Sequence, residues 1–185
     1  MKHVVFKSLL MIASTCLIAS AYSQECQVKA NKENSPNQRV ALILSHTHIP
    51  AVNEYTGEKK SFVAASIGAN YEFWFNSQWA VGLHNDLVMQ SFNVEQKTNG
   101  AVTKREYPLL TTLVGIYKPW EHWSIFAGTG KEFEKHENLT VIKTGIEYGV
   151  PLPKNFEAGL GVEYDVKIEG NDSWLVGIGV SKSFF

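Results

Sequence analysis

The sequence is short of cysteine, of long apolar runs and of surplus positive charge. Its cysteines are Cys16 and Cys26, too few for a zinc site built on several thiolates. Beyond residue 23, no apolar stretch approaches the roughly 20 residues that a transmembrane helix needs. Basic and acidic residues number 17 and 18, so the basic excess typical of nucleic-acid-binding proteins is missing. We expect no nucleic-acid partner.

Motifs for enzymatic chemistry are missing as well. Gly128-Thr129-Gly130 lies in an alternating segment, and no helix is predicted after it to supply phosphate-binding amides. No serine occupies a Gly-x-Ser-x-Gly elbow. The sequence therefore predicts no enzyme activity, no catalytic residues and no cofactor.

The first 23 residues have the features of a secretion signal. Lys2 and Lys7 form a basic start, and residues 9–18 are apolar apart from two hydroxyl residues. Ala21 and Ser23 then place small side chains at the two positions that signal peptidase recognises before its cleavage site. Removing this leader leaves 15 basic against 18 acidic residues, a net charge of −3. We expect a cleaved signal peptide over 1–23 and a polar periplasmic tail over 24–38.

From Val40 onward, apolar and polar residues alternate with a period of two, which indicates strands. The connections are long at 50–61 and 93–103 but short at 76–78, 118–121 and 151–154. Alternating long loops and short turns are expected of an outer-membrane barrel, with the short turns on the periplasmic side. Pro108 predicts a bulge or a strand end, because proline cannot donate to a ladder. The eight predicted runs are 40–49, 62–75, 79–92, 104–117, 122–132, 139–150, 155–168 and 173–185.

The glycines decide which face of these strands points inward. A secreted lipocalin-like carrier would also alternate, with its apolar face inside. Here, however, the strand glycines can be placed on the face that carries the charges, and small residues beside long charged ones suit a narrow barrel interior. The aliphatic and aromatic residues must then face lipid. The glycines in question are Gly68, Gly82, Gly115, Gly128, Gly130, Gly145, Gly149, Gly159, Gly161, Gly177 and Gly179.

Aromatic residues gather beside the short turns, as they do in the interfacial girdles of outer-membrane barrels. A soluble core would not concentrate them there. The three groups are Tyr71, Phe73, Phe75 and Trp79; Tyr117, Trp120 and Trp123; and Tyr148 and Phe156. The pattern predicts an all-β, eight-stranded antiparallel up-and-down transmembrane barrel over 39–185, with the lipid bilayer as its surroundings.

The leader, the eight amphipathic runs and the aromatic C-terminus resemble the small OmpA/OmpX-type barrels of bacterial outer membranes. In that family a terminal aromatic on the lipid face marks the chain for the barrel assembly machinery. The face of the last strand that contains Phe184 also carries Lys182, Val180 and Ile178, whereas the face that contains Phe185 carries Ser183, Ser181 and Gly179. Phe184 is therefore the expected signal residue, with Lys182 reaching toward the interface. The resemblance implies architecture and an outer-membrane location, not an activity.

The predicted lumen is strongly ionic, and buried charges must be paired. The residues predicted to face it are His46, His48, Glu72, His84, Asp86, Glu132, Lys143, Glu147, Glu157, Glu163, Asp165 and Lys167. We expect mainly a structural network of salt bridges. An alternative is a divalent-metal site at the extracellular mouth, because histidine and carboxylate ligands suit zinc. Its residues would be His46, His48, Asp86 and Glu132.

The leading hypothesis for function is a non-enzymatic outer-membrane barrel protein with an envelope-structural or surface-loop binding role. The alternatives are a small transporter or channel, and a binder of a divalent metal or small ligand at the mouth. Eight strands leave a lumen that side chains fill, so a wide pore is not expected. Nothing in the sequence identifies a partner for the loops.

Overall fold

The computed structural model describes residues 37–52, 59–95, 100, 102–135 and 137–184. The predicted leader and nearly all of the predicted tail lie outside these residues. Within them, no helix is long and apolar enough to cross a membrane.

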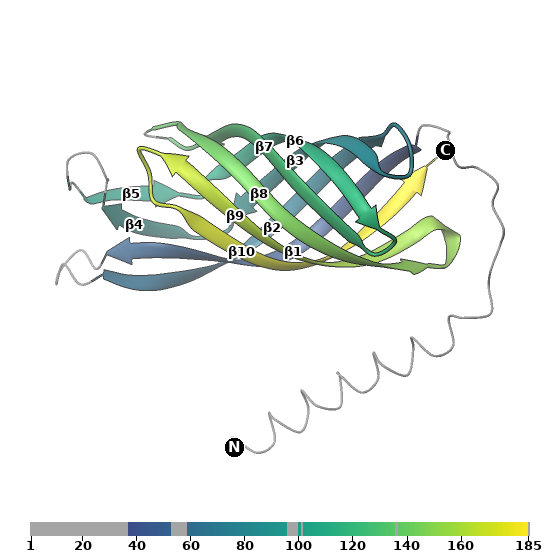
Figure 1. Cartoon of the computed structure of the whole chain (residues 1–185). Coiled ribbons are helices and arrows are strands. Elements are labelled where there is room, and N and C mark those ends of the chain that lie inside the picture. The colour runs from purple at the N-terminus through teal and green to yellow at the C-terminus, as the bar shows by residue number, and fades with distance from the viewer. Residues whose placement is uncertain (1–36, 53–58, 96–99, 101, 136, 185) are drawn as a thin grey trace, which may run out of the picture. The chain divides into compact units, whose positions relative to one another are not determined.

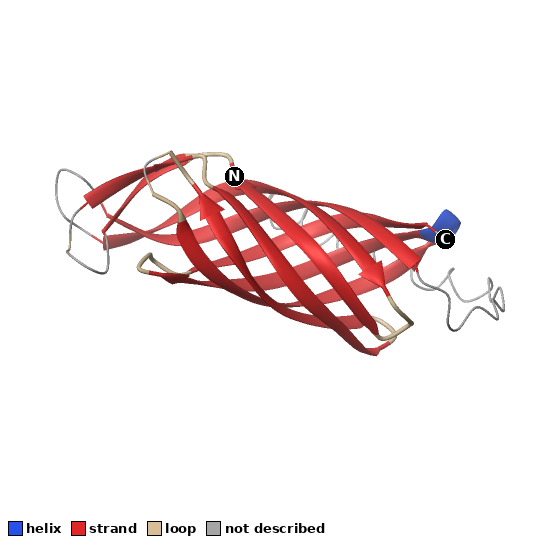
Figure 2. Cartoon of the chain, turned by 90° about the horizontal axis from the view of Figure 1, so that it is seen from above, coloured by secondary structure: helices blue, strands red, loops and turns tan. Residues whose placement is uncertain are grey.

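Eight antiparallel strands close into a barrel in the order β1-β10-β9-β8-β7-β6-β3-β2 (Figures 1 and 2). Each barrel strand pairs with the next barrel strand along the chain, so that β3 pairs with β6. β1 closes the ring by pairing with β10 along Gln38–His48. The fold class predicted from alternation is confirmed. The barrel strands are β1 (Asn37–Val52), β2 (Lys59–Trp74), β3 (Trp79–Val88), β6 (Leu109–Trp120), β7 (Trp123–Phe133), β8 (Leu139–Leu152), β9 (Phe156–Ile168) and β10 (Ser173–Phe184).

A two-stranded hairpin interrupts the connection between β3 and β6. It consists of β4 (Ser91–Glu95) and β5 (Val102–Glu106), which pair only with each other. The third and fourth runs were predicted to reach residue 92 and to begin at 104, and both limits are wrong because these residues belong to the hairpin. The break expected at Pro108 is present, since β6 starts at Leu109. Tyr107, just before it, has a φ of 47° that redirects the chain.

The β2–β3, β6–β7 and β8–β9 turns lie at one end of the barrel, and the hairpin lies at the other together with the β9–β10 turn (Figure 1). We call these the turn end and the loop end. Asn76 closes the β2–β3 turn by accepting hydrogen bonds from the amides of Gln78 and Trp79 at 2.8 and 2.9 Å. The β8–β9 turn is a 3-10 turn, η2 (Pro153–Asn155). Both termini of the barrel also lie at the turn end (Figure 1).

Two inward-facing glycines allow β6 and β7 to approach closely. A Cβ on Gly128 would lie 2.0 Å from the Leu113 carbonyl oxygen, and one on Gly130 would lie 1.9 Å from the Thr111 carbonyl oxygen. Gly115 is the exception to the predicted glycine face. It is exposed on the outer side of β6, because Val114 and Ile116 occupy the buried positions of that strand.

Candidate functional site: the charged lumen and the loop end

The outer face of the barrel is apolar along its whole circumference. Leu42, Leu44, Leu113 and Ile178 are each at least 60 % exposed, and every barrel strand contributes similar side chains. Exposed apolar area of this extent is unfavourable in water and is tolerated in lipid. The alternation therefore has the orientation predicted from the glycines, with the exception of Gly115.

Aromatic side chains cluster on this outer face near the turn end. Trp79 packs on Tyr117 with ring centroids 4.4 Å apart, and Trp123 packs on Tyr148 at 4.9 Å. Lys182 lies over the Phe184 ring at 5.4 Å, and Phe184 is 46 % exposed. The outward register predicted for Phe184 is thus confirmed, while Phe185 lies outside the described residues.

Inside the barrel, the first group of charges is the turn-end cluster, centred on Arg39 of β1. Its guanidinium donates to both carboxylate oxygens of Glu72, at 2.7 and 2.9 Å, and to Glu157 at 2.5 Å. Glu147 lies 3.5 Å away. The Trp74 indole adds a hydrogen bond of 2.9 Å to Glu72. One cation therefore connects three carboxylates from β2, β8 and β9.

The second group is the central cluster around Lys143 of β8, whose side chain is 0 % exposed. Its ammonium donates to Asp86 of β3 at 2.7 Å and to Glu163 of β9, and it lies 3.5 Å from Asp165. Asp86 and Lys143 are 57 residues apart in the sequence. This cation therefore ties two separate parts of the barrel wall together across the lumen.

The third group, the loop-end cluster, is centred on Glu132 of β7. Arg105 of β5 donates to one oxygen of Glu132 at 2.5 Å, and Lys167 of β9 contacts the other at 2.6 Å. All three side chains are at most 7 % exposed. The cluster also fixes the β4–β5 hairpin to the barrel, because Arg105 belongs to the hairpin and Glu132 to β7.

Charge is distributed unevenly along the lumen. With Lys118, which lies 3.6 Å from Glu157, the turn-end cluster carries two cations and three carboxylates. The central cluster has one cation and three carboxylates. With Glu137, which lies 3.9 Å from Arg105, the loop-end cluster has two cations and two carboxylates. With every group ionised, the net charges are −1, −2 and 0.

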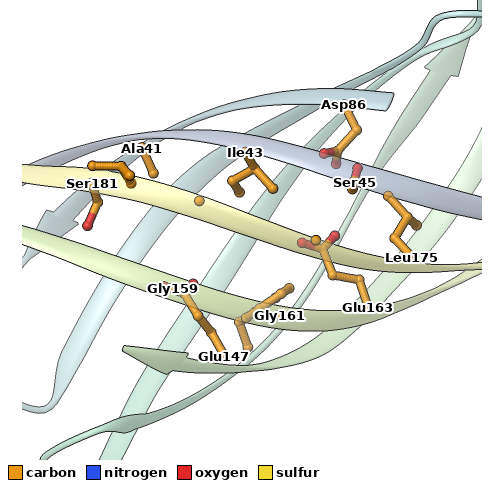
Figure 3. Close-up of a pocket in the computed structure, with 14 residues that line it drawn as sticks. Ala41, Ile43, Ser45, Asp86, Glu147, Gly159, Gly161, Glu163, Leu175 and Ser181 are labelled. Atoms are coloured by element: carbon orange, nitrogen blue, oxygen red, sulfur yellow. The ribbon is translucent and has the colours of Figure 1, made fainter. Parts of the chain in front are cut away.

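A cavity of about 510 Å³ runs beside the central cluster. Small residues of β9, β10 and β1, such as Gly161, Gly179 and Ala41, form one wall, and the carboxylates of Glu147 and Glu163 also line it (Figure 3). None of its described lining residues is basic. The cavity therefore offers acidic oxygens to a small occupant.

His84 of β3 is the least satisfied polar side chain described in the lumen. It is 1 % exposed, and neither ring nitrogen has a hydrogen-bond partner. Its Nε2 lies 3.6 Å from Glu72, and its ring meets Phe126 edge-on at 5.0 Å. These contacts hold the imidazole between the turn-end and central clusters.

The four residues of the alternative metal site are not brought together. His46 is exposed on the outer face, and His48 stacks on the outward-facing Trp174 at 3.8 Å. Placing these histidines in the lumen was wrong, because Ser45 and Thr47 occupy the buried positions of β1. Asp86 and Glu132 do face inward but belong to different clusters. No group of three metal-ligand side chains forms among the described residues.

Three cations of the lumen, Arg39, Arg105 and Lys118, were not among the predicted lumen residues. Arg39 had a detectable signal, because it is two residues before the small, inward-facing Ala41. Arg105 had none, since its role depends on the hairpin that folds over the mouth. The remaining inward-facing charges, from Glu72 to Lys167, were predicted on the correct face.

The loop end has a small hydrophobic core of its own. Ile49, Ala64 and Val88 of the barrel pack against Phe92 and Val94 of the hairpin, and all five are buried. The side-chain amide of Asn171, in the β9–β10 turn, donates to the Glu95 carbonyl at 2.7 Å. The hairpin is therefore held to the barrel by apolar packing and by a hydrogen bond.

Comparison with known proteins identifies solved structures that share this fold. No family model matches the chain, and no curated protein does either. Among solved structures, Ail of Yersinia pestis, crystallised with the heparin analogue sucrose octasulfate, has 16% sequence identity and a TM-score of 0.53, with 81% of this chain and 99% of that chain covered. The outer membrane protein OprG from Pseudomonas aeruginosa has 12% identity and a TM-score of 0.55, with coverages of 82% and 97%. Identities this low establish the fold alone.

The chain is a membrane-spanning β-barrel of the bacterial outer-membrane type. The closed ring of eight strands, the apolar exterior and the filled ionic lumen together define that class. Within it, the chain has the architecture of the small OmpA/OmpX-type barrels, as the sequence pattern predicted.

Proposed function

We propose that this protein is a non-enzymatic outer-membrane barrel with a closed lumen, whose loop end serves as a recognition surface. The central cluster is the observation that carries the closed lumen. Lys143, Asp86 and Glu163 come from three strands and meet inside the barrel. An interior of eight strands is just wide enough for side chains to fill, so bridges of this kind block it.

The absence of enzyme activity is part of the proposal and is supported by how the lumen acids are used. The carboxylates of all three clusters contact cations, and most are at least three-quarters buried. A general acid or base must instead reach a substrate proton. The acids of the lumen are therefore better suited to holding the wall together than to catalysis.

The recognition role is supported by the way the loop end is built. A connection that served only to join two strands would not need a hairpin with a buried Phe92 and a buried Arg105. Ordered extramembrane structure on a rigid barrel is a common way to present a binding surface. We place this surface on the extracellular side and the short turns on the periplasmic side.

Planar-bilayer recording of the purified full-length protein tests the closed lumen. We expect no steady single-channel currents after insertion, with protein incorporation verified by co-flotation with the lipid. Steady and sizeable currents would refute the closed lumen. Fractionation of cells that express the chain tests its location, and recovery in a soluble fraction without detergent would contradict it.

A second candidate, slow passage of small cations, is favoured by the acidic cavity beside the central cluster. In this case small currents would be carried by K⁺ and not by Cl⁻, as measured by the reversal potential in a salt gradient. Gly161→Leu would abolish them, because a side chain there enters the cavity without meeting backbone closer than 3.7 Å. Gly115→Leu, on the outer face, is the matched control.

A further inference from the structure

Among the apolar side chains of the outer face, β3, β6, β7 and β8 also carry polar ones. These share the strand parity of the exposed Leu83, Leu113, Ile125 and Ile142, so they face outward. Asn85 lies directly opposite Thr111, and Thr129 lies opposite Leu113, the next outward residue of β6. We call this continuous group the polar patch; it consists of Asn85, Thr111, Thr129 and Thr144.

The polar patch lies near the middle of the lipid-facing belt. Thr129 is six residues along β7 from Trp123 of the turn-end aromatic residues, and Asn85 is six residues along β3 from Trp79. A tilted strand rises about 2.5 Å per residue along the membrane normal, so six residues span about 15 Å of a belt about 25 Å tall. Lipid tails offer no hydrogen bonds at this depth, so exposed amides and hydroxyls are costly there.

The other half of the barrel wall is different at the same depth. Among the described residues of β1, β2, β9 and β10, the outward-facing positions there are aliphatic. Ile178 is six residues from Phe184, and Val162 is six residues from Phe156; these two aliphatic side chains are 64 % and 45 % exposed. The polar side chains are therefore gathered on one side of the barrel, as expected of a contact surface.

Hydrogen bonds within one copy satisfy the polar patch only in part. The Thr111 hydroxyl donates to the Asn85 side-chain oxygen at 3.0 Å, and the Asn85 amide donates to the Ala69 carbonyl at 3.0 Å. The Thr129 hydroxyl donates to the Val141 carbonyl at 3.0 Å. An amide has two N–H donors and a hydroxyl oxygen has two lone pairs. The bonds among the described residues therefore leave one Asn85 donor and the threonine acceptors for another partner.

We propose that two copies of this protein pair in the membrane about a two-fold axis, polar patch against polar patch. A two-fold contact puts the same surface on both sides, so that surface must be complementary to itself. The polar patch meets this condition, because it contains donors and acceptors but no charged side chain. Gly115 and Ala127, which lie opposite each other beside it, allow two walls to approach closely, as small residues do between membrane helices.

Lys131 borders the polar patch on its loop-end side and does not oppose the pairing. It is exposed and lies eight residues along β7 from Trp123, or about 20 Å along the membrane normal. Its long side chain can therefore hold the ammonium among the headgroups, and two copies can pair without burying either charge. The pairing goes beyond the closed lumen and the recognition role and depends on neither.

Sedimentation equilibrium of the purified full-length protein in density-matched detergent micelles tests the pairing. We expect a monomer–dimer equilibrium. Asn85→Leu and Thr129→Val nearly preserve side-chain volume and replace a polar group with one that lipid accepts, so the barrel should still fold. Each should raise the dimer dissociation constant by about three- to tenfold, in line with the strength of hydrogen bonds between membrane helices.

Val162→Thr is the matched control for these variants. It adds a hydroxyl at the same depth on the other half of the barrel, so it should leave the dissociation constant unchanged. Heat-modifiable migration on gels verifies that each variant is folded.

Disulfide cross-linking in lipid vesicles locates the contact. Cys16 and Cys26 are replaced by serine, and a single new cysteine is introduced by Ala127→Cys or, as the control, by Ile178→Cys. Oxidation should link two copies of the Ala127→Cys protein and leave the Ile178→Cys protein monomeric.

Three results would overturn the inference: a protein that stays monomeric at every concentration, a dimer that neither Asn85→Leu nor Thr129→Val weakens, or equal cross-linking of the two cysteine variants. A monomer would mean that something other than a second copy, such as a different membrane protein, covers the polar patch. The closed lumen and the membrane location are tested separately by bilayer currents and fractionation, so the failures are distinguishable.

Discussion

Lys143→Met tests whether the central cluster holds the barrel together. The ammonium contacts Asp86, Glu163 and Asp165 and is wholly buried. Methionine keeps most of the side-chain volume but leaves three carboxylates without their shared cation. Removing one partner of a buried ion pair costs about 3–5 kcal/mol, because the other charge remains desolvated. We therefore expect the variant to lose about that much of its free energy of unfolding.

Urea unfolding in detergent micelles, followed by the fluorescence of the protein's 5 tryptophans, measures the loss. Lys131→Met is the control, because Lys131 is exposed on the outer face of β7. It should change stability by no more than about 0.5 kcal/mol. Adding Asp86→Asn to Lys143→Met should recover part of the loss, since it removes one stranded charge.

A loss below about 1 kcal/mol for Lys143→Met, at an unchanged denaturant slope, would refute this reasoning. It would mean that water reaches the three carboxylates as readily as it reaches an exposed group. The lumen would then be hydrated along the central cluster, and the closed-lumen proposal would lose its main support.

Three further outcomes are expected. Phe92→Ala should increase amide hydrogen exchange in β4 and β5 while leaving the barrel strands protected, because its cost of about 3–5 kcal/mol falls on the loop-end core. Gly128→Ala should reduce the yield of folded barrel, measured by heat-modifiable migration on gels, because the added Cβ would lie 2.0 Å from a backbone oxygen. Gly115→Ala should leave the yield unchanged, because the nearest atom to its Cβ is 3.9 Å away. Phe184→Ala should lower the amount of assembled protein in the membrane fraction if the C-terminal strand is the assembly signal, and an unchanged amount would exclude that role.

The sequence predicted the strands and their faces because a barrel in lipid imposes a strict period of two. Lys143 and Glu132 were placed inside on that basis. The same rule would have placed His46 outside, since it shares the parity of the exposed Leu42 and Leu44. The error came from giving chemical character more weight than position in the strand. A polar side chain near the end of a strand can face outward at low cost, because it is close to the membrane interface.

The contacts across the lumen could not be predicted. The pairing of Lys143 with Asp86 depends on strand tilt and stagger, which alternation does not encode. The hairpin was missed for a related reason. Its strands lie outside the barrel wall, so nothing requires them to alternate between lipid and lumen, and the polar segment 93–103 resembled an ordinary loop. Arg105 could be recognised only once that hairpin was known.

The uneven charge of the lumen predicts which ions any residual current would carry. With every group ionised, the central cluster has a net charge of −2 and the turn-end cluster one of −1. A small anion is therefore repelled along the lumen, whereas a small cation is attracted. Any residual current should be carried by K⁺, and a reversal potential that identifies Cl⁻ as the carrier would contradict this polarity.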